Sequence, residues 1–81
     1  MRVTVRLFAR LRDIAGAADV VREVAPDATA SAVWRDLVRE FPDLAPYEGS
    51  MSTAINAEYA RMDDAVHDGD EVAFLPPVSG G

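Results

Sequence analysis

One stretch of the chain, residues 30–41, carries apolar side chains at helical spacing, and strand-like segments lie on both sides of it. The apolar stripe consists of Val33, Trp34, Leu37, Val38 and Phe41. Thr29 is the expected N-cap, and Pro42 ends the helix because the residue before a proline is disfavoured in the α region. A single helix can cover only one face of a sheet, so the chain is restricted to an α+β arrangement.

Five other segments alternate apolar and polar residues with the period of a strand. They are residues 3–10, 19–24, 52–57, 59–62 and 71–75. A connecting loop is expected at 42–49, and Asp68-Gly69-Asp70 is expected to form a tight turn. The order of these elements predicts an α+β β-grasp (ubiquitin-like) roll, with a mixed sheet of about five strands and one main helix on one face. Residues 1–75 would form this domain, and residues 76–81 an extended C-terminal tail that ends in Gly-Gly.

Composition excludes several classes of function. The chain has 81 residues, which allow one core, and 14 acidic residues against eight basic ones give a net charge of −6. This balance argues against nucleic acid as a partner and favours partners with basic surfaces. The chain has no cysteine and therefore no zinc–thiolate site or thiol nucleophile. No stretch reaches membrane-spanning length, so we expect a cytoplasmic protein with no membrane partner.

Few residues could carry catalysis. His67 is the single histidine, and it precedes a turn, where a solvated role is favoured over metal binding. The adjacent carboxylates of Asp63 and Asp64 suit turn and helix-cap roles better than paired acid–base chemistry. No glycine-rich phosphate loop occurs, and the Asp68–Asp70 segment lacks the remaining ligands of a calcium loop. We therefore expect no metal site and no enzyme activity from the domain alone.

The second face of the sheet is a candidate interaction surface. Strand alternation directs one set of side chains toward the helix: Val3, Val5, Leu7, Val72 and Phe74. The same alternation turns Phe8 and Leu75 outward, and Tyr59 joins them from the short strand. Arg6, Arg10 and Arg12 would rim this patch. Large apolar residues grouped on a solvated face favour a partner surface, while isolated surface apolar residues are the alternative.

The C-terminal segment Pro76-Pro77-Val78-Ser79-Gly80-Gly81 is the second candidate. Two prolines stop the last strand and force an extended exit. The final glycines have no Cβ, so they fit a narrow channel, and the reactive group would be the main-chain carboxylate. This carboxylate needs activation, for example as a mixed anhydride with AMP. The alternative is a frayed terminus without a role.

These segments resemble the MoaD/ThiS family of ubiquitin-like sulfur carriers. The most specific part is Asp68-Gly69-Asp70-Glu71-Val72 followed by Phe74-Leu75-Pro76-Pro77-Val78-Ser79-Gly80-Gly81. Residues 5–9 with Arg12 and Gly16 also resemble the family's first strand and turn, and Ala54-Ile55-Asn56 its third strand. The ending is typical of the molybdopterin branch of the family.

The resemblance implies a mechanism and three protein partners. An E1-like adenylyltransferase would use ATP to convert the Gly81 carboxylate to an acyl-adenylate, and a persulfide sulfur donor would then leave a thiocarboxylate. The tail would enter the large catalytic subunit of molybdopterin synthase, where the sulfur forms the pterin dithiolene. Gly80 and the spacer Pro76, Pro77, Val78 and Ser79 would let Gly81 reach that site, and no cofactor would be bound to the carrier.

The resemblance also implies an interface and leaves alternatives open. By position, Phe8, Arg12, Tyr59 and Leu75 match family residues that contact the large subunit. Related carriers serve thiamine synthesis, cysteine synthesis or tRNA thiolation, and archaeal relatives are protein modifiers that are conjugated to lysine. A plain interaction domain with an idle tail is the remaining alternative.

Overall fold

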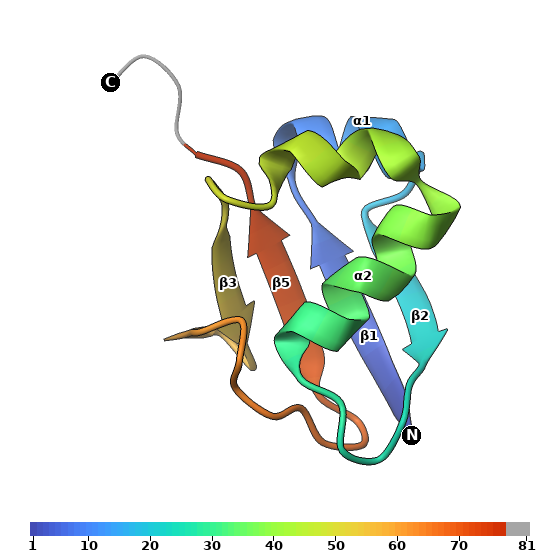
Figure 1. Cartoon of the computed structure of the whole chain (residues 1–81), viewed down its shortest axis with the longest axis vertical. Helices are drawn as coiled ribbons and strands as arrows, with labels where there is room; N and C mark the ends of the chain where they lie inside the picture. The colour runs from blue at the N-terminus through green and yellow to red at the C-terminus, as the bar shows by residue number, and fades with distance from the viewer. Residues whose placement is uncertain (78–81) are drawn as a thin grey trace.

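The computed structural model of the chain describes residues 1–77. These residues form five strands, two α-helices and one 3₁₀ helix (Figure 1). In chain order the elements are β1 (Arg2–Leu7), α1 (Ala9–Ala15), β2 (Asp19–Glu23), α2 (Ala30–Glu40), η1 (Pro42–Tyr47), β3 (Ser52–Ile55), β4 (Glu58–Ala60) and β5 (Glu71–Leu75). Among the described residues, no helix is both long enough and apolar enough to span a membrane.

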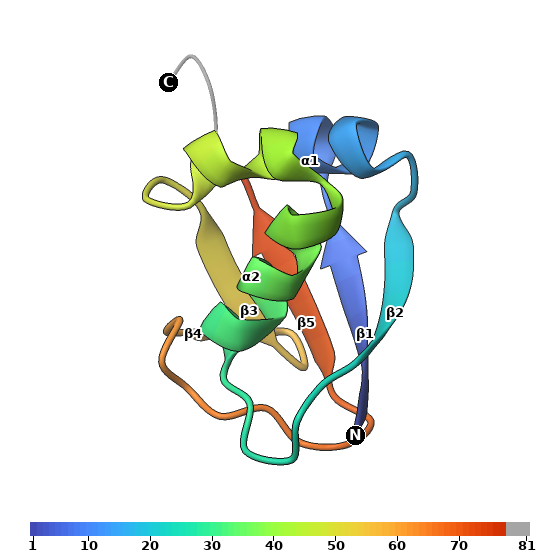
Figure 2. The same ribbon diagram turned by 45° about the vertical axis from the view of Figure 1, so that its right-hand side comes forward.

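The five strands form one mixed sheet in the order β2-β1-β5-β3-β4. The central strands β1 and β5 are parallel, and every other neighbouring pair is antiparallel. Helix α2 crosses one face of this sheet, as Figures 1 and 2 show from two directions. The predicted α+β β-grasp fold with one main helix on one face is confirmed.

The core lies between α2 and the sheet. Val5 is opposite Val72, and Leu7 is opposite Phe74, so the inward positions of β1 and β5 meet side by side. The edge of the Trp34 ring packs on Phe74 with 5.0 Å between the ring centroids and 63° between the planes. All five side chains are at most 2% exposed. This confirms the inward positions predicted from strand alternation.

Helix α2 is held at its first turn by long-range hydrogen bonds. The Thr29 hydroxyl accepts from the backbone N–H of Ala32 at 3.2 Å, as its N-cap position predicts. The next free N–H groups donate to backbone carbonyls of the segment after β4: Ala30 to Asp64 at 3.0 Å and Ser31 to Met62 at 2.8 Å. The initial turn of α2 is therefore anchored to a part of the chain more than 30 residues away, which satisfies donors that a helix leaves unpaired.

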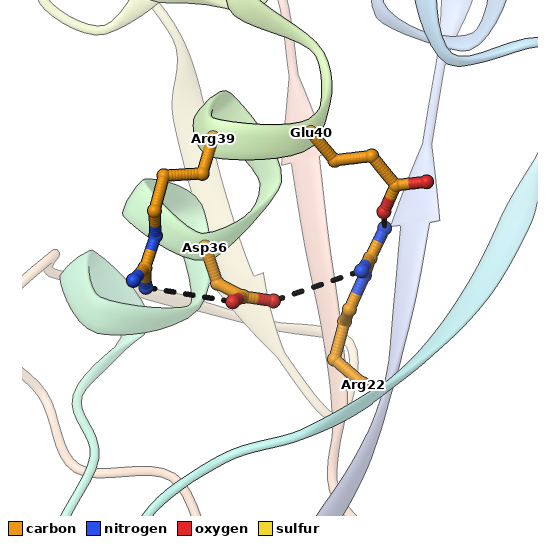
Figure 3. A network of polar contacts seen from close by, with 4 residues as sticks. All are labelled: Arg22, Asp36, Arg39 and Glu40. Carbon is orange, nitrogen blue, oxygen red and sulfur yellow. Dashed lines mark hydrogen bonds and ion pairs between the residues drawn. The ribbon is translucent and has the colours of Figure 1, made fainter.

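An ionic network joins the other half of α2 to the edge strand β2 (Figure 3). The Arg22 guanidinium contacts Glu40, lies 3.8 Å from the Asp36 carboxylate and lies 6.0 Å from the centre of the Phe41 ring. Arg39 approaches Asp36 from the opposite side at 3.5 Å. The Arg22 side chain lies on the face of β2 that α2 covers, so these contacts connect α2 to this edge of the sheet.

The prediction that the first strand continues to residue 10 is wrong. Strand β1 ends at Leu7, and helix α1 begins at Ala9, whose φ is +50°. Leu11 of α1 is fully buried, and the helix ends at Gly16, where φ is +76° and the N–H donates to the Arg12 carbonyl at 2.8 Å. Alternation could not show this turn, because residues 8–10 keep the period of a strand while the backbone changes direction.

The return hairpin is also shorter than predicted. Strand β3 ends at Ile55, and β4 covers only Glu58–Ala60. Between them lie Asn56 and Ala57 at φ of +51° and +70°, the positive pair that a tight two-residue hairpin turn requires. Alanine rarely adopts a positive φ, so the sequence pattern indicated no turn at Ala57 and predicted a strand that continued through it, over residues 52–57. The expected loop at 42–49 contains the 3₁₀ helix η1.

Candidate functional site

The face of the sheet opposite α2 carries a row of side chains from four neighbouring strands. Arg6 of β1 is in register with Ala73 of β5, Ala73 with Ala54 of β3, and Ala54 with Tyr59 of β4. Two small side chains therefore stand between two large ones. The surface of the sheet is therefore depressed at Ala54 and Ala73 and raised by the side chains of Arg6 and Tyr59 at either end of the row.

A groove of about 340 Å³ lies over this row. Ala54 and Ala73 form its floor, and the large apolar side chains of Phe8, Tyr59 and Leu75 stand around them. Tyr59 is 85% exposed and Phe8 is 39% exposed, which is unusual for side chains of this size. We call this feature the sheet-face groove; its other lining residues are Arg6, Ala57 and Glu71.

A cluster of three charged side chains lies at one end of the sheet-face groove. The Arg6 Nε lies 3.2 Å from a carboxylate oxygen of Asp19 and 3.5 Å from one of Glu71. All three side chains are about half exposed, so water screens these pairs and they contribute little to stability. Their effect is local, since they hold the Arg6 side chain beside the alanine floor.

The hairpin that presents Tyr59 is tied to the start of β5 by Asn56. The Asn56 side chain donates to Asp70 at 2.9 Å and accepts from the Glu71 N–H at 3.0 Å, and the Asn56 backbone N–H donates to the Glu71 carbonyl at 2.8 Å. The Asn56 hydrogen bond and the backbone N–H of His67, which donates at 2.8 Å, lower the pKa of Asp70 despite its partial burial. Both effects favour the ionised carboxylate.

Three of the predicted interface residues, Phe8, Tyr59 and Leu75, come together around the sheet-face groove. Arg12 does not line it; it lies exposed on α1, as does Arg10, while Arg6 does line the groove. Pro76 and Pro77 follow directly from the end of β5. The predicted site residues Val78, Ser79, Gly80 and Gly81 lie outside the described residues.

The residues expected to have structural roles lie in turns. His67 is 80% exposed, and its Nδ1 is 3.6 Å from Asp70 within the turn before β5. The Asp64 carboxylate accepts from the Arg61 N–H at 2.9 Å, and the Asp68 carboxylate from the Arg2 N–H at 2.7 Å. Within residues 1–77, no three histidine or acidic side chains are grouped so that they could hold a metal ion.

Sequence reasoning missed the floor of the sheet-face groove. The sequence pattern does not indicate Ala54 and Ala73 as site residues, because a small apolar residue on an open face carries no chemical signal of its own. Strand alternation placed Leu75 outward, and the same rule also turns Ala73 outward two residues earlier. Only the cross-strand register, which aligns Ala54 with Ala73, reveals that the two form one surface.

The sequence is similar to one family throughout almost its whole length. The profile described as the ThiS family matches residues 5–81. Among characterised relatives, the molybdopterin synthase sulfur carrier subunit of Arabidopsis thaliana is 33% identical over 81 residues, which cover 100% of this chain and 84% of the relative.

Solved structures share the fold. The small archaeal modifier protein 1 of Haloferax volcanii superposes with a TM-score of 0.84 at 30% identity, covering 95% of this chain and 98% of that one. A chain in the complex of subunits 1 and 2 of the molybdopterin-converting factor from Helicobacter pylori has a TM-score of 0.70 at 27% identity, with 100% of both chains covered. The chain is thus similar both to a carrier subunit and to a protein modifier.

Proposed function

Because the chain belongs to the ThiS family, we propose that it is the sulfur carrier subunit of a molybdopterin synthase. The observation that carries this proposal is the position of the sheet-face groove. Leu75 lines the groove and is the last residue of β5, so the segment that ends in Gly81 starts at the groove's edge. Similarity to a named sulfur carrier subunit over the whole chain supports the same conclusion.

The chemistry of the proposed carrier takes place at the Gly81 carboxylate. A carboxylate oxygen attacks the α-phosphorus of ATP on an E1-like adenylyltransferase, which releases pyrophosphate and leaves an acyl-adenylate. The terminal sulfur of a persulfide donor then attacks the acyl carbon, and AMP leaves. A thiol reduces the resulting acyl disulfide, and the products are a Gly81 thiocarboxylate and a disulfide of the donor with that thiol. ATP is consumed by the partner, and the carrier itself binds no cofactor.

Delivery of the sulfur depends on the length and the composition of the tail. Residues 76–81 span at most about 20 Å when fully extended, so the acceptor must bind close to the end of β5. Gly80 and Gly81 have no Cβ and fit a channel that would exclude other residues. The large subunit of the synthase would supply the catalytic groups, and the carrier would contribute the thiocarboxylate and the docking surface.

Deletion of Gly80 and Gly81 tests the proposal. The shortened chain is expected to bind the cognate large subunit through the sheet-face groove, but a mixture of adenylyltransferase, ATP and persulfide donor should no longer load it with sulfur. A deletion variant that still supports molybdopterin formation by the large subunit would refute the carrier function. Circular dichroism of the variant shows whether the domain is still folded.

Similarity to a small archaeal modifier protein supports a second candidate function, attachment of Gly81 to a lysine of another protein. This function uses the same acyl-adenylate but transfers the acyl group to an amine. It predicts conjugates that survive denaturing electrophoresis and disappear when Gly81 is deleted. The chain contains no lysine, so its own side chains cannot accept the acyl group in such conjugates.

A further inference from the structure

We propose that the sheet-face groove is a socket for one projecting apolar side chain of the large subunit, and that Ala54 and Ala73 keep this socket open. The proposal rests on the proposed function, since its partner is the protein that receives the tail. It assigns a role to two residues that have no reactive group and no polar contact.

The position of the tail determines which protein covers the groove. Any protein that takes Gly81 into its active site must contact the surface around Pro76, where the tail leaves β5. A stable interface buries about 800 Å² on each partner, which corresponds to a disc of about 16 Å radius. Leu75 both ends β5 and lines the groove, so the groove lies within that disc. The protein that accepts the tail therefore covers the groove as well.

The dimensions of the floor indicate what enters the groove. Ala54 and Ala73 are directly opposite each other on adjacent strands, and neighbouring strands lie about 4.8 Å apart. The floor is therefore two strands wide, with Arg6 and Tyr59 one strand further out on either side, and the space that their side chains leave between them suits one aliphatic or aromatic side chain. Tyr59 closes the row on one side and Arg6 on the other, while Phe8 and Leu75 complete the walls. A flat partner surface would leave the floor uncovered, whereas one projecting side chain would fill it.

The chemistry of the lining selects an apolar side chain. The side chains of Ala54, Ala73 and Leu75 offer no hydrogen-bond donor or acceptor, so a polar group would lose its water without replacement. The one charged pair of the lining, Arg6 and Glu71, is mutually neutralised at 3.5 Å. The exposed ring of Tyr59 is the type of residue that forms binding hot spots around such a contact. The net charge of −6 on the chain favours basic residues on the partner around the apolar contact.

Variants of Ala73 test the socket. Ala73→Leu fills the floor, and we expect it to weaken binding of the cognate large subunit about tenfold or more in isothermal titration calorimetry. Ala73→Gly keeps the floor low and apolar and should bind within about threefold of the wild type, at some cost in stability. Thr4→Leu adds comparable apolar bulk on the same face outside the groove, and it should also bind like the wild type. Ala54→Leu should reproduce the loss seen with Ala73→Leu.

The outcomes separate the socket from the proposed function. If the wild-type chain binds the large subunit and Ala73→Leu binds equally well, the socket is refuted while the carrier function stands. If the wild-type chain does not bind the large subunit, the proposed function itself fails. A loss of binding by Thr4→Leu as large as that by Ala73→Leu also refutes the socket. Melting curves identify unfolded variants, and Ala73→Val replaces Ala73→Leu if the latter does not fold.

Discussion

The Asn56–Ala57 turn predicts a glycine substitution that stabilises the protein. Ala57 has a φ of +70°, in the left-handed region where the Cβ of an L-residue meets the following carbonyl. We expect Ala57→Gly to raise the free energy of unfolding. The same substitution at Ala60, three residues later within β4, should lower it, since Ala60 is not among the residues with positive φ.

The magnitude follows from two opposing terms. The left-handed conformation costs a residue with a Cβ about 1–2 kcal/mol, which Ala57→Gly removes. Glycine adds conformational entropy to the unfolded chain, which costs about 0.5–1 kcal/mol. At the midpoints of these two ranges the net stabilisation is about 0.75 kcal/mol, which for a domain of this size corresponds to a rise in Tm of about 3–6 °C. At Ala60 only the entropic cost remains, and Tm should fall by a similar amount.

Thermal unfolding followed by circular dichroism distinguishes the two substitutions. The expected result is opposite signs: a higher Tm for Ala57→Gly and a lower Tm for Ala60→Gly, both relative to the wild type. A fall in Tm for both variants would show that the turn does not hold Ala57 in the left-handed region. The assignment of the hairpin, and with it the position of Tyr59 at the groove, would then be incorrect.

Three further predictions concern the site and the core. Asn56→Ala should lower the free energy of unfolding more at pH 7 than at a pH well below 3.8, the ordinary pKa of the carboxyl, because the lowered pKa of Asp70 contributes stability only while its carboxylate is ionised. Urea titrations at both pH values measure this, and an equal loss at both would contradict it. Phe8→Ala should weaken binding to the large subunit about tenfold or more. The control Val21→Ala, at an exposed position of β2 outside the groove, should change binding less than about threefold. Similar dissociation constants for the two variants in calorimetry would count against the groove. Trp34→Ala should lower the free energy of unfolding by about 3–5 kcal/mol, which is enough to unfold much of a domain this small. A two-state urea curve close to that of the wild type would argue against the packing of Trp34 on Phe74.

The sequence predicted the elements whose signals are local and repeated. Helix α2 could be located because its apolar stripe has to face the core. Its start is marked by the N-cap Thr29, and its end by Pro42, which disfavours the α conformation of the residue before it. Alternation placed Phe8 and Leu75 outward from the core strands. The adjacency of Phe8 and Leu75 followed from the expected pairing of the first and last strands, and Tyr59 was expected to join them from the short strand.

The sequence did not predict features that depend on distant contacts or on unusual backbone angles. Helix α1 is seven residues long with one fully buried side chain, Leu11, and its N-cap Phe8 has no side-chain hydrogen bond to the helix. Such a helix has too few turns to show a period. The left-handed angles of Ala9 and Ala57 occur in a residue type that rarely adopts them.

The floor of the sheet-face groove required the register of the sheet. Ala54 and Ala73 are 19 positions apart in the sequence, and they are opposite each other because β3 and β5 pair antiparallel with that alignment. Arg12 shows the reverse case. The sequence resemblance predicts Arg12 at the partner interface, whereas the structure places Arg12 on α1 and outside the groove lining. A role for Arg12 at the partner interface stays a prediction.

The central claim is that Gly81 carries sulfur as a thiocarboxylate. The direct measurement is the mass of a C-terminal fragment of the protein after incubation with its adenylyltransferase, ATP, a persulfide donor and a thiol. The fragment must exclude Met1, Met51 and Met62, because oxidation of a methionine adds nearly the same mass as replacement of oxygen by sulfur. The carrier function predicts a fragment heavier by that replacement, and only when ATP is present. A fragment of unchanged mass, with the adenylyltransferase active on the chain, would contradict it.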